Sequence, residues 1–187
     1  MDNWLQAVEQ LKQYLYVDEN DLLREKCNNE AYLDAVVQQG EKIFWDYRDA
    51  DRMKICGILG NLYRIKGDLE TALPYLERYK EYCFDYENEE VATLALLRYA
   101  EGLKFAREYK DALAAFEEVL ERCQLFNIEK YENNAWQHLG KCYVEMGDLQ
   151  QAENCFLKAL MLRKKINDPK LLEASESVLN FMMNIKK

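Results

Sequence analysis

Two stretches eighty residues apart decide how this chain is expected to fold: YRIKGDLETALPYL (residues 63–76) and YVEMGDLQQAENCF (residues 143–156). Halfway between them lies LKFAREYKDALAAF (residues 103–116), which lacks the glycine but keeps the alanine and the bulky residue after it. Aligning Ala72, Ala112 and Ala152 gives a repeat of forty residues that holds twice without a gap. A period of about 20 to 50 residues is typical of solenoid proteins, so a repeat architecture is the first hypothesis.

Each repeat is predicted to contain two helices joined by a tight turn. Apolar residues recur at three- and four-residue spacing on both sides of the turn, for example in residues 53–66 and 149–162. Gly67 and Gly147 can adopt the left-handed conformation that ends a helix, and Asp68 and Asp148 can cap the helix that follows. Small residues stand where the two helices must approach closely, namely Gly60, Ala100 and Gly140 on the first helices and Ala72, Ala112 and Ala152 on the second.

The composition fits a single all-α domain. Of the 187 residues, 49% are hydrophobic, and only 7 Gly and 2 Pro interrupt the chain. So few turn-forming residues favour long helices over a sheet. The net charge of −9 disfavours binding to nucleic acid, no apolar run is long enough to span a membrane, and the first residues do not resemble a signal peptide. We therefore expect a cytoplasmic protein whose partners include neither nucleic acid nor a membrane.

The sequence offers little for catalysis or metal binding. His138 is the only histidine, and the 6 cysteines form no CxxC pair and have no histidine at metal-ligand spacing. Cysteines in a reducing compartment usually pack as small hydrophobes, and we expect that role here. We expect His138 to be a polar residue of a groove or of the surface. We therefore expect no enzymatic activity, no metal site and no cofactor.

The ends of the chain depart from the repeat. Residues 1–49 are expected to form degenerate N-terminal helices, residues 50–166 three repeats, and residues 167–187 a C-terminal capping helix, all in one domain of residues 1–187. Asp168 can cap this last helix, and Pro169 suits its first position. The stretch VDENDLLREKCNN (residues 17–29) fits no repeat register.

The third repeat resembles the tetratricopeptide repeat signature at Trp136, Leu139, Gly140, Tyr143, Gly147, Ala152, Phe156 and Ala159. The resemblance covers about residues 50 to 166 and implies a right-handed α-solenoid of antiparallel helix pairs that serves as a protein-interaction scaffold. The unit of forty residues is longer than the family's standard of about 34. In this it is similar to the long repeats of kinesin light chains and of bacterial peptide-pheromone receptors.

In the tetratricopeptide architecture the first helix of each repeat lines a concave groove that holds the ligand. The resemblance implies that the groove here is formed by Lys54, Asn61, Arg64, Leu94, Leu97, Arg98, Glu101, Lys104, Gln137 and Lys141. These residues are expected to be exposed, and they include five basic residues and one acidic residue on a chain of net charge −9. Such a surface attracts and orients acidic segments. In related repeats an asparagine at the position of Asn61 often bonds to the backbone of the bound peptide.

Two functions follow as hypotheses. The leading one is a non-enzymatic module that binds a peptide segment, expected to be acidic, in the groove. The alternative is a structural or regulatory assembly subunit that associates with itself. Apolar residues spread widely around the predicted last helix, and Phe181, Met182 and Ile185 are candidates for an exposed patch through which a homodimer would form.

Overall fold

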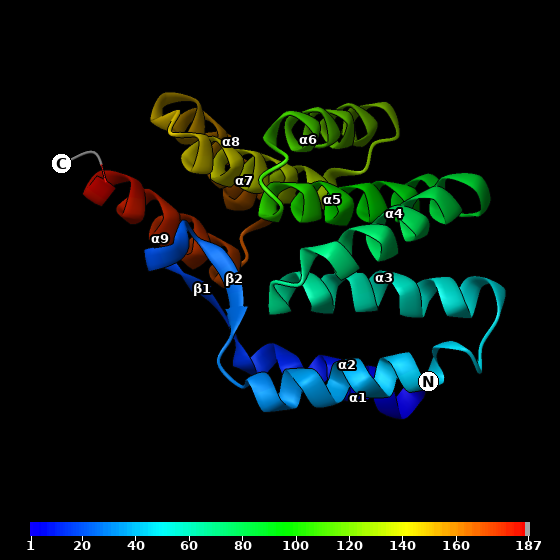
Figure 1. The fold of residues 1–187 in the computed structure, drawn as a ribbon. Coiled ribbons are helices and arrows are strands. Elements are labelled where there is room, and N and C mark those ends of the chain that lie inside the picture. Colours follow the sequence, from blue (N-terminus) through cyan, green and yellow to red (C-terminus); the bar gives the residue numbers. More distant parts are fainter. Residues whose placement is uncertain (186–187) are drawn as a thin grey trace.

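The computed structural model describes residues 1–185 and consists mainly of helices packed in consecutive pairs (Figure 1). The N-terminal helices α1 (Asp2–Leu11) and α2 (Glu30–Phe44) are separated by a short hairpin. The array continues with α3 (Asp49–Lys66), α4 (Leu69–Tyr86), α5 (Glu89–Phe105), α6 (Tyr109–Leu125), α7 (Glu129–Met146), α8 (Leu149–Ile166) and α9 (Pro169–Ile185). The predicted all-α array of helix pairs is thus confirmed.

Small residues stand at the crossings within the pairs, as the sequence predicted. Ala112 is completely buried, and a Cβ atom added to Gly60 would lie 2.8 Å from Cγ of Leu76. A Cβ atom added to Gly140 would lie 2.5 Å from the ring of Phe156. Real side chains do not tolerate such short contacts, because protein interiors are close-packed. These crossings therefore require residues without bulk.

The turns inside the three pairs share one backbone geometry. Gly67 and Gly147 have φ values of 84° and 82°, and their amides donate hydrogen bonds to Arg64 and Val144. The middle repeat adopts the same conformation without glycine, because Arg107 has a φ of 63°. Asp68 and Asp148 cap the next helices as predicted, each accepting a hydrogen bond of 3.1 Å from the backbone amide three residues later.

The last helix begins as predicted, with Asp168 accepting a hydrogen bond of 2.8 Å from the amide of Lys170. The expected exposed patch is wrong for two of its three residues, because Phe181 and Met182 are buried beside Val144 and Phe156. Ile185 remains exposed. The helix packs more deeply than its apolar spread suggested, because it covers both α8 and part of the hairpin.

A two-stranded hairpin is the element that the sequence did not predict. Strands β1 (Leu15–Asp18) and β2 (Arg24–Cys27) are antiparallel, and short 3-10 turns lie before β1 (Lys12–Tyr14) and between the strands (Glu19–Asp21). In Figure 1 the hairpin leaves the layer of α1 and α2 and extends across the array to α9. Leu23 at its tip is buried in the cluster formed by α7, α8 and α9, so the hairpin joins the two ends of the array.

The cysteines behave as the sequence predicted. All six are free, and all except Cys27 are buried. Burial raises the pKa of Cys56, Cys123, Cys142 and Cys155 to about 11. Thiols with such a raised pKa are poor nucleophiles, so packing is the role that fits them.

Residues 1–185 contain neither a candidate membrane span nor a candidate metal-binding cluster. No helix there has the length and hydropathy needed to cross a membrane. Within the same residues, no group of three or more histidine, cysteine, aspartate or glutamate side chains is arranged to hold a metal ion.

Candidate binding groove

A cavity of about 330 Å³ lies between the first helices of the three repeats and the hairpin. Helices α3, α5 and α7 supply most of its walls, and Val17, Leu23 and Glu25 of the hairpin supply the rest. Eight of the ten groove residues expected from the sequence line it: Asn61, Arg64, Leu94, Leu97, Arg98, Glu101, Lys104 and Lys141. The cavity is therefore the structural counterpart of the predicted groove.

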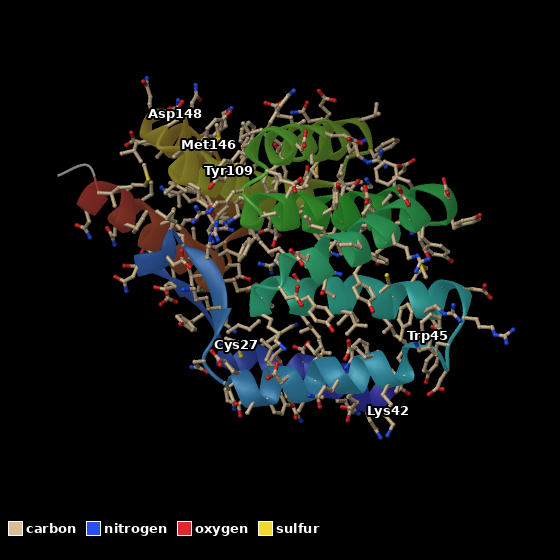
Figure 2. All side chains as sticks on the ribbon, viewed as in Figure 1. Cys27, Lys42, Trp45, Tyr109, Met146 and Asp148 are labelled. Atoms are coloured by element: carbon tan, nitrogen blue, oxygen red, sulfur yellow. The ribbon has the colours of Figure 1, made fainter. Side chains whose placement is uncertain are left out.

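The other two residues lie outside this cavity. Lys54 is exposed near the start of α3, which begins at the edge of the array opposite the hairpin (Figure 1). Figure 2 labels Trp45 at that same edge, far from the hairpin. Gln137 is buried within α7 and does not line the cavity. The part of the groove that the cavity occupies is thus the part nearest the hairpin.

The expectation of exposed basic residues is wrong for Arg64, Lys104 and Lys141, whose exposed fractions are 2%, 1% and 6%. The hairpin covers them, and carboxylates neutralise two of the three. Arg64 lies 2.7 Å from a carboxylate oxygen of Glu25 on β2 and 3.6 Å from one of Glu101. Such carboxylate partners offset the large free-energy cost of removing a cation from water.

Phe105 at the end of α5 supports this group of charges. Its ring lies 4.6 Å from the guanidinium of Arg64 and 4.5 Å from the ammonium of Lys104, within the range of cation–π attraction. Arg24 of the hairpin lies over the same ring at 5.2 Å. One aromatic ring thus contacts three cations, two from the repeats and one from the hairpin.

Glu145 on α7 is the main site residue that the sequence interpretation missed. Its side chain is fully buried and accepts hydrogen bonds from Lys104 and Tyr109, each at 3.2 Å, and it also pairs with Arg24 of the hairpin. A signal for it was present in the sequence. Glu145 follows Lys141 by four residues, so both residues lie on the same face of the helix.

Lys141 is a buried cation of the cavity and makes no ion pair with a carboxylate among residues 1–185. Its ammonium donates a hydrogen bond of 3.0 Å to the backbone carbonyl of Leu23. Burial, together with the nearby charge of Lys104, lowers the pKa of Lys141 to about 8. An ammonium has three donors, so Lys141 retains the capacity to bind an anionic or carbonyl oxygen.

His138 lies in the groove, one of the two places expected for it. Its Nε2 atom is 3.2 Å from Glu101, while burial and the cations around it hold its pKa well below the usual value. The ring is therefore neutral, and its contact with Glu101 is a hydrogen bond rather than an ion pair. Its Nδ1 atom is buried and has no hydrogen-bond partner within the described chain.

Asn61 holds Arg64 in place. Its side-chain oxygen accepts hydrogen bonds of 3.1 Å and 2.8 Å from the Arg64 guanidinium. Its amide nitrogen remains available as a donor, so the expected bond to a peptide backbone stays a prediction. Leu94 and Leu97 supply the apolar part of the same wall, and Arg98 stands half-buried beside them.

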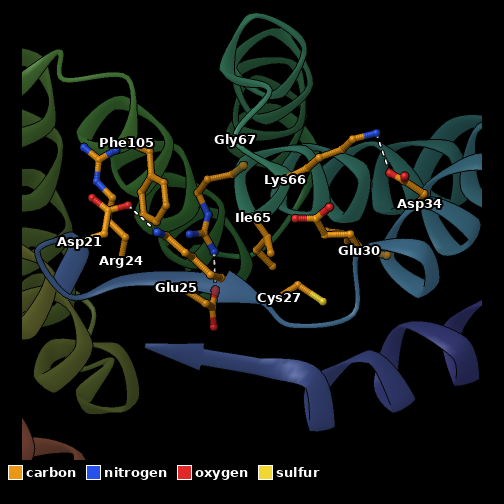
Figure 3. Close-up of a pocket in the computed structure, with 13 residues that line it drawn as sticks. Asp21, Arg24, Glu25, Cys27, Glu30, Asp34, Ile65, Lys66, Gly67 and Phe105 are labelled. Carbon is orange, nitrogen blue, oxygen red and sulfur yellow. Dashed lines mark hydrogen bonds and ion pairs between the residues drawn. The ribbon is translucent and has the colours of Figure 1, made fainter. Parts of the chain in front are cut away.

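A second cavity, of about 350 Å³, lies next to the first one and is lined by residues of β2 (Figure 3). It is lined by Cys27 and Lys26 of the hairpin, by the start of α2 and by the end of α3. Figure 3 shows Glu25 and Phe105 at its wall, and both residues also line the first cavity. The Arg64–Glu25 pair therefore separates two hollows, and the hairpin fills the groove only in part.

The structure is similar to solved proteins built from helical repeats. The apo form of RapI matches with a TM-score of 0.68 at 18% sequence identity. The matched region covers 85% of this chain and 58% of the RapI chain. PlcR of Bacillus thuringiensis, solved in complex with the peptide PapR7 and DNA, matches with a TM-score of 0.68 at 16% sequence identity. The matched region covers 79% of this chain and 54% of the PlcR chain. This chain therefore spans between half and three fifths of those two proteins.

Another similar structure matches over nearly the whole of both chains. The TPR-like repeats of a Podosopora anserina kinesin light chain protein match with a TM-score of 0.64 at 13% sequence identity. The matched region covers 98% of this chain and 95% of that protein's chain. Identities this low show the fold alone. No curated protein sequence matches this chain significantly.

Two models of the tetratricopeptide repeat match the sequence itself. One matches residues 54–86, which comprise most of α3 and α4, and the other matches residues 90–165, which comprise α5 to α8. The matched residues coincide with the three helix pairs and with the groove that they form. The chain belongs to the tetratricopeptide repeat family.

Proposed function

We propose that this protein binds a segment of another protein in the groove between α3, α5 and α7, and that the segment carries a carboxylate. Tetratricopeptide repeats are in general protein- and peptide-binding scaffolds. The observation that carries the proposal is Lys141, a buried cation that borders a cavity and has only a backbone carbonyl as its hydrogen-bond partner within residues 1–185. A ligand carboxylate would supply the charge that this site lacks.

The surrounding side chains suit a peptide rather than a free ion. Leu94 and Leu97 offer apolar contact, while Asn61 can donate to a backbone carbonyl. Arg98 lines the cavity without an ion pair inside the described chain, so it can accept a second acidic residue. Apolar contact would then supply most of the affinity, and the cations would set the preference for acidic segments.

The test compares two sets of arrayed nine-residue random peptides, one with glutamate and the other with glutamine at the central position. The wild-type protein should prefer the glutamate set. Lys141→Met should weaken binding to that set by about tenfold or more, because a charge-assisted hydrogen bond is lost. Lys54→Met is the matched control, since Lys54 is exposed on α3 outside the cavity. This variant should bind the glutamate set as tightly as the wild type does.

The same assay at different pH values gives the second arm of the test. The pKa of Lys141 is about 8, so its charge is lost as the pH rises from 7 to 9. Binding to the glutamate set should fall over that range in the wild type, and Lys141→Met should abolish this part of the pH dependence. Equal binding of both peptide sets by the wild type, or equal loss in the Lys54 and Lys141 variants, would refute the groove as the site.

A further inference from the structure

The groove is already occupied by the chain's own hairpin. Three consecutive residues of the hairpin each make a different kind of contact with the repeats. Leu23 is 1% exposed and packs in an apolar cluster with Val144 and Phe156, while its carbonyl accepts the hydrogen bond from Lys141. Arg24 pairs with the buried carboxylate of Glu145, and Glu25 pairs with Arg64 at 2.7 Å.

These contacts have the chemistry expected of a bound peptide. An acidic side chain meets a basic residue of the groove, an apolar side chain fills a pocket, and a backbone carbonyl takes a donor. They join residues distant in sequence, since Leu23 and Lys141 are 118 positions apart and Arg24 and Glu145 are 121 apart. The hairpin therefore occupies the groove as a separate segment would, although it belongs to the same chain.

The hairpin itself is weakly built. Its two strands have four residues each, and an isolated two-stranded hairpin is at best marginally stable in water. Leu22 and Leu23 both have positive φ values, of 51° and 62°, a conformation that leucine rarely adopts. Tyr16 and Val17 on β1 are exposed. The tip of the hairpin is held by the contacts of Leu23, Arg24 and Glu25 with the repeats, so a ligand that replaces those contacts can displace the tip.

We propose that the hairpin occupies the groove in place of the ligand when no ligand is bound. The natural ligand is a protein segment with an apolar, a basic and an acidic residue in succession. This segment would take the places of Leu23, Arg24 and Glu25 and displace the hairpin from the groove. The two cavities beside the Arg64–Glu25 pair leave room for a segment that fits more closely. This inference rests on the proposed function and specifies the part of the ligand that replaces the hairpin, whereas the carboxylate proposed for Lys141 belongs to another residue of the same segment.

The test uses a fluorescent synthetic peptide of residues 14–28 with Cys27→Ser as the probe. The full-length variant Leu23→Ala, Glu25→Ala has a weakened hairpin and an intact groove. It should bind the probe at least tenfold more tightly than the wild type, because its own hairpin competes less. The control variant is Tyr16→Ser, which alters an exposed residue of the same hairpin and should bind the probe as the wild type does.

Changes in the probe test the pattern of residues. Probes with Leu23→Ala or with Glu25→Gln should each bind the weakened variant at least tenfold less tightly than the original probe. Circular dichroism checks that the variant is folded. The single variant Glu25→Gln serves instead if the double variant is unfolded, and it should also bind more tightly than the wild type.

A second measurement uses the wild type alone. Amide hydrogen exchange of residues 15–27 should speed up when the probe saturates the protein, because the hairpin leaves the groove. Equal affinity of the probe for wild type and weakened variant, absence of binding to either, or unchanged exchange at saturation would each overturn the inference. The arrayed glutamate peptides could still bind in a Lys141-dependent way, so the proposed function would survive that result.

Discussion

At residue 107 the middle repeat carries an arginine where the other two carry Gly67 and Gly147. All three positions are left-handed and end the first helix of their pair with equivalent hydrogen bonds. The left-handed conformation costs a residue with a side chain about 1 to 2 kcal/mol. The turn is therefore imposed by the packing of α5 and α6, and at this residue it works against the local preference of the chain.

Arg107→Gly should stabilise the protein by about 1 kcal/mol, because glycine adopts this conformation without steric conflict. Chemical denaturation by urea measures the change. Arg107→Ala is the control, since it removes the same exposed side chain and keeps the strain, and it should give little or no gain. An equal gain from both variants would attribute the effect to the arginine side chain and refute the backbone argument.

At the scale of the elements, helices within a pair are held by close contact between small residues. Ala112 on α6 is completely buried in the core cluster that includes Ala100 and Phe116. Ala114, two residues along the same helix, is exposed. The helix therefore presents one tightly packed face and one free face, as the 3.6-residue period requires.

Ala112→Leu should destabilise the protein by about 1 to 3 kcal/mol, since the added methylene groups have no space at the crossing of α5 and α6. Thermal and urea denaturation provide the measurement. Ala114→Leu makes the same chemical change on the exposed face and should alter the free energy of unfolding by no more than about 0.5 kcal/mol. If Ala112→Leu had as small an effect, the assignment of Ala112 to the crossing would be wrong.

The capping helix α9 is anchored by a buried arginine on α8. Arg163 donates hydrogen bonds to Asn133 at 2.9 Å and to Ser175 at 3.0 Å, so it joins α7, α8 and α9. Its partners are neutral oxygens, and burial lowers the pKa of Arg163 to about 10. A buried guanidinium provides directional bonds in a fixed fork geometry, and these orient α9 on the end of the array.

At the scale of the whole molecule, the hairpin links the first and last helices. Leu23 packs beside α9, and Ser177 of α9 donates a hydrogen bond of 3.1 Å to Glu19. An open solenoid leaves its end helices with apolar surface to cover. Here Leu23 from the N-terminal end joins the cluster at the C-terminal end in which Phe181 and Met182 are buried with residues of α7 and α8.

Because that surface is covered, we expect a monomer rather than the homodimer hypothesised from the sequence. Sedimentation velocity at micromolar concentration should give a mass near 22.2 kDa. The exposed apolar residues at the end of α9 are Met183 and Ile185. A dimer that disappears in the variant Met183→Lys, Ile185→Lys would contradict this expectation and support self-association through α9.

The sequence by itself determined the parts of this protein that depend on neighbouring residues. The period of forty, the helix ends at Gly67 and Gly147, the caps at Asp68 and Asp148, and the start of the last helix at Pro169 all lie where the sequence placed them. Each results from hydrogen bonds or side-chain contacts within a few positions along the chain, and such local preferences can be recognised in a single sequence. The groove residues came from the resemblance to the tetratricopeptide repeat, and eight of the ten line the cavity.

Only the tertiary structure decided what the groove contains. Arg64, Lys104 and Lys141 were expected to be exposed and are buried, because a hairpin with no repeat signal lies over them. Glu25 meets Arg64 across 39 positions and Arg24 meets Glu145 across 121, so neither pair leaves a periodic trace in the sequence. Contacts of this kind exist only once the array has formed and brought its two ends within reach of one short segment, which is why local patterns could not predict them.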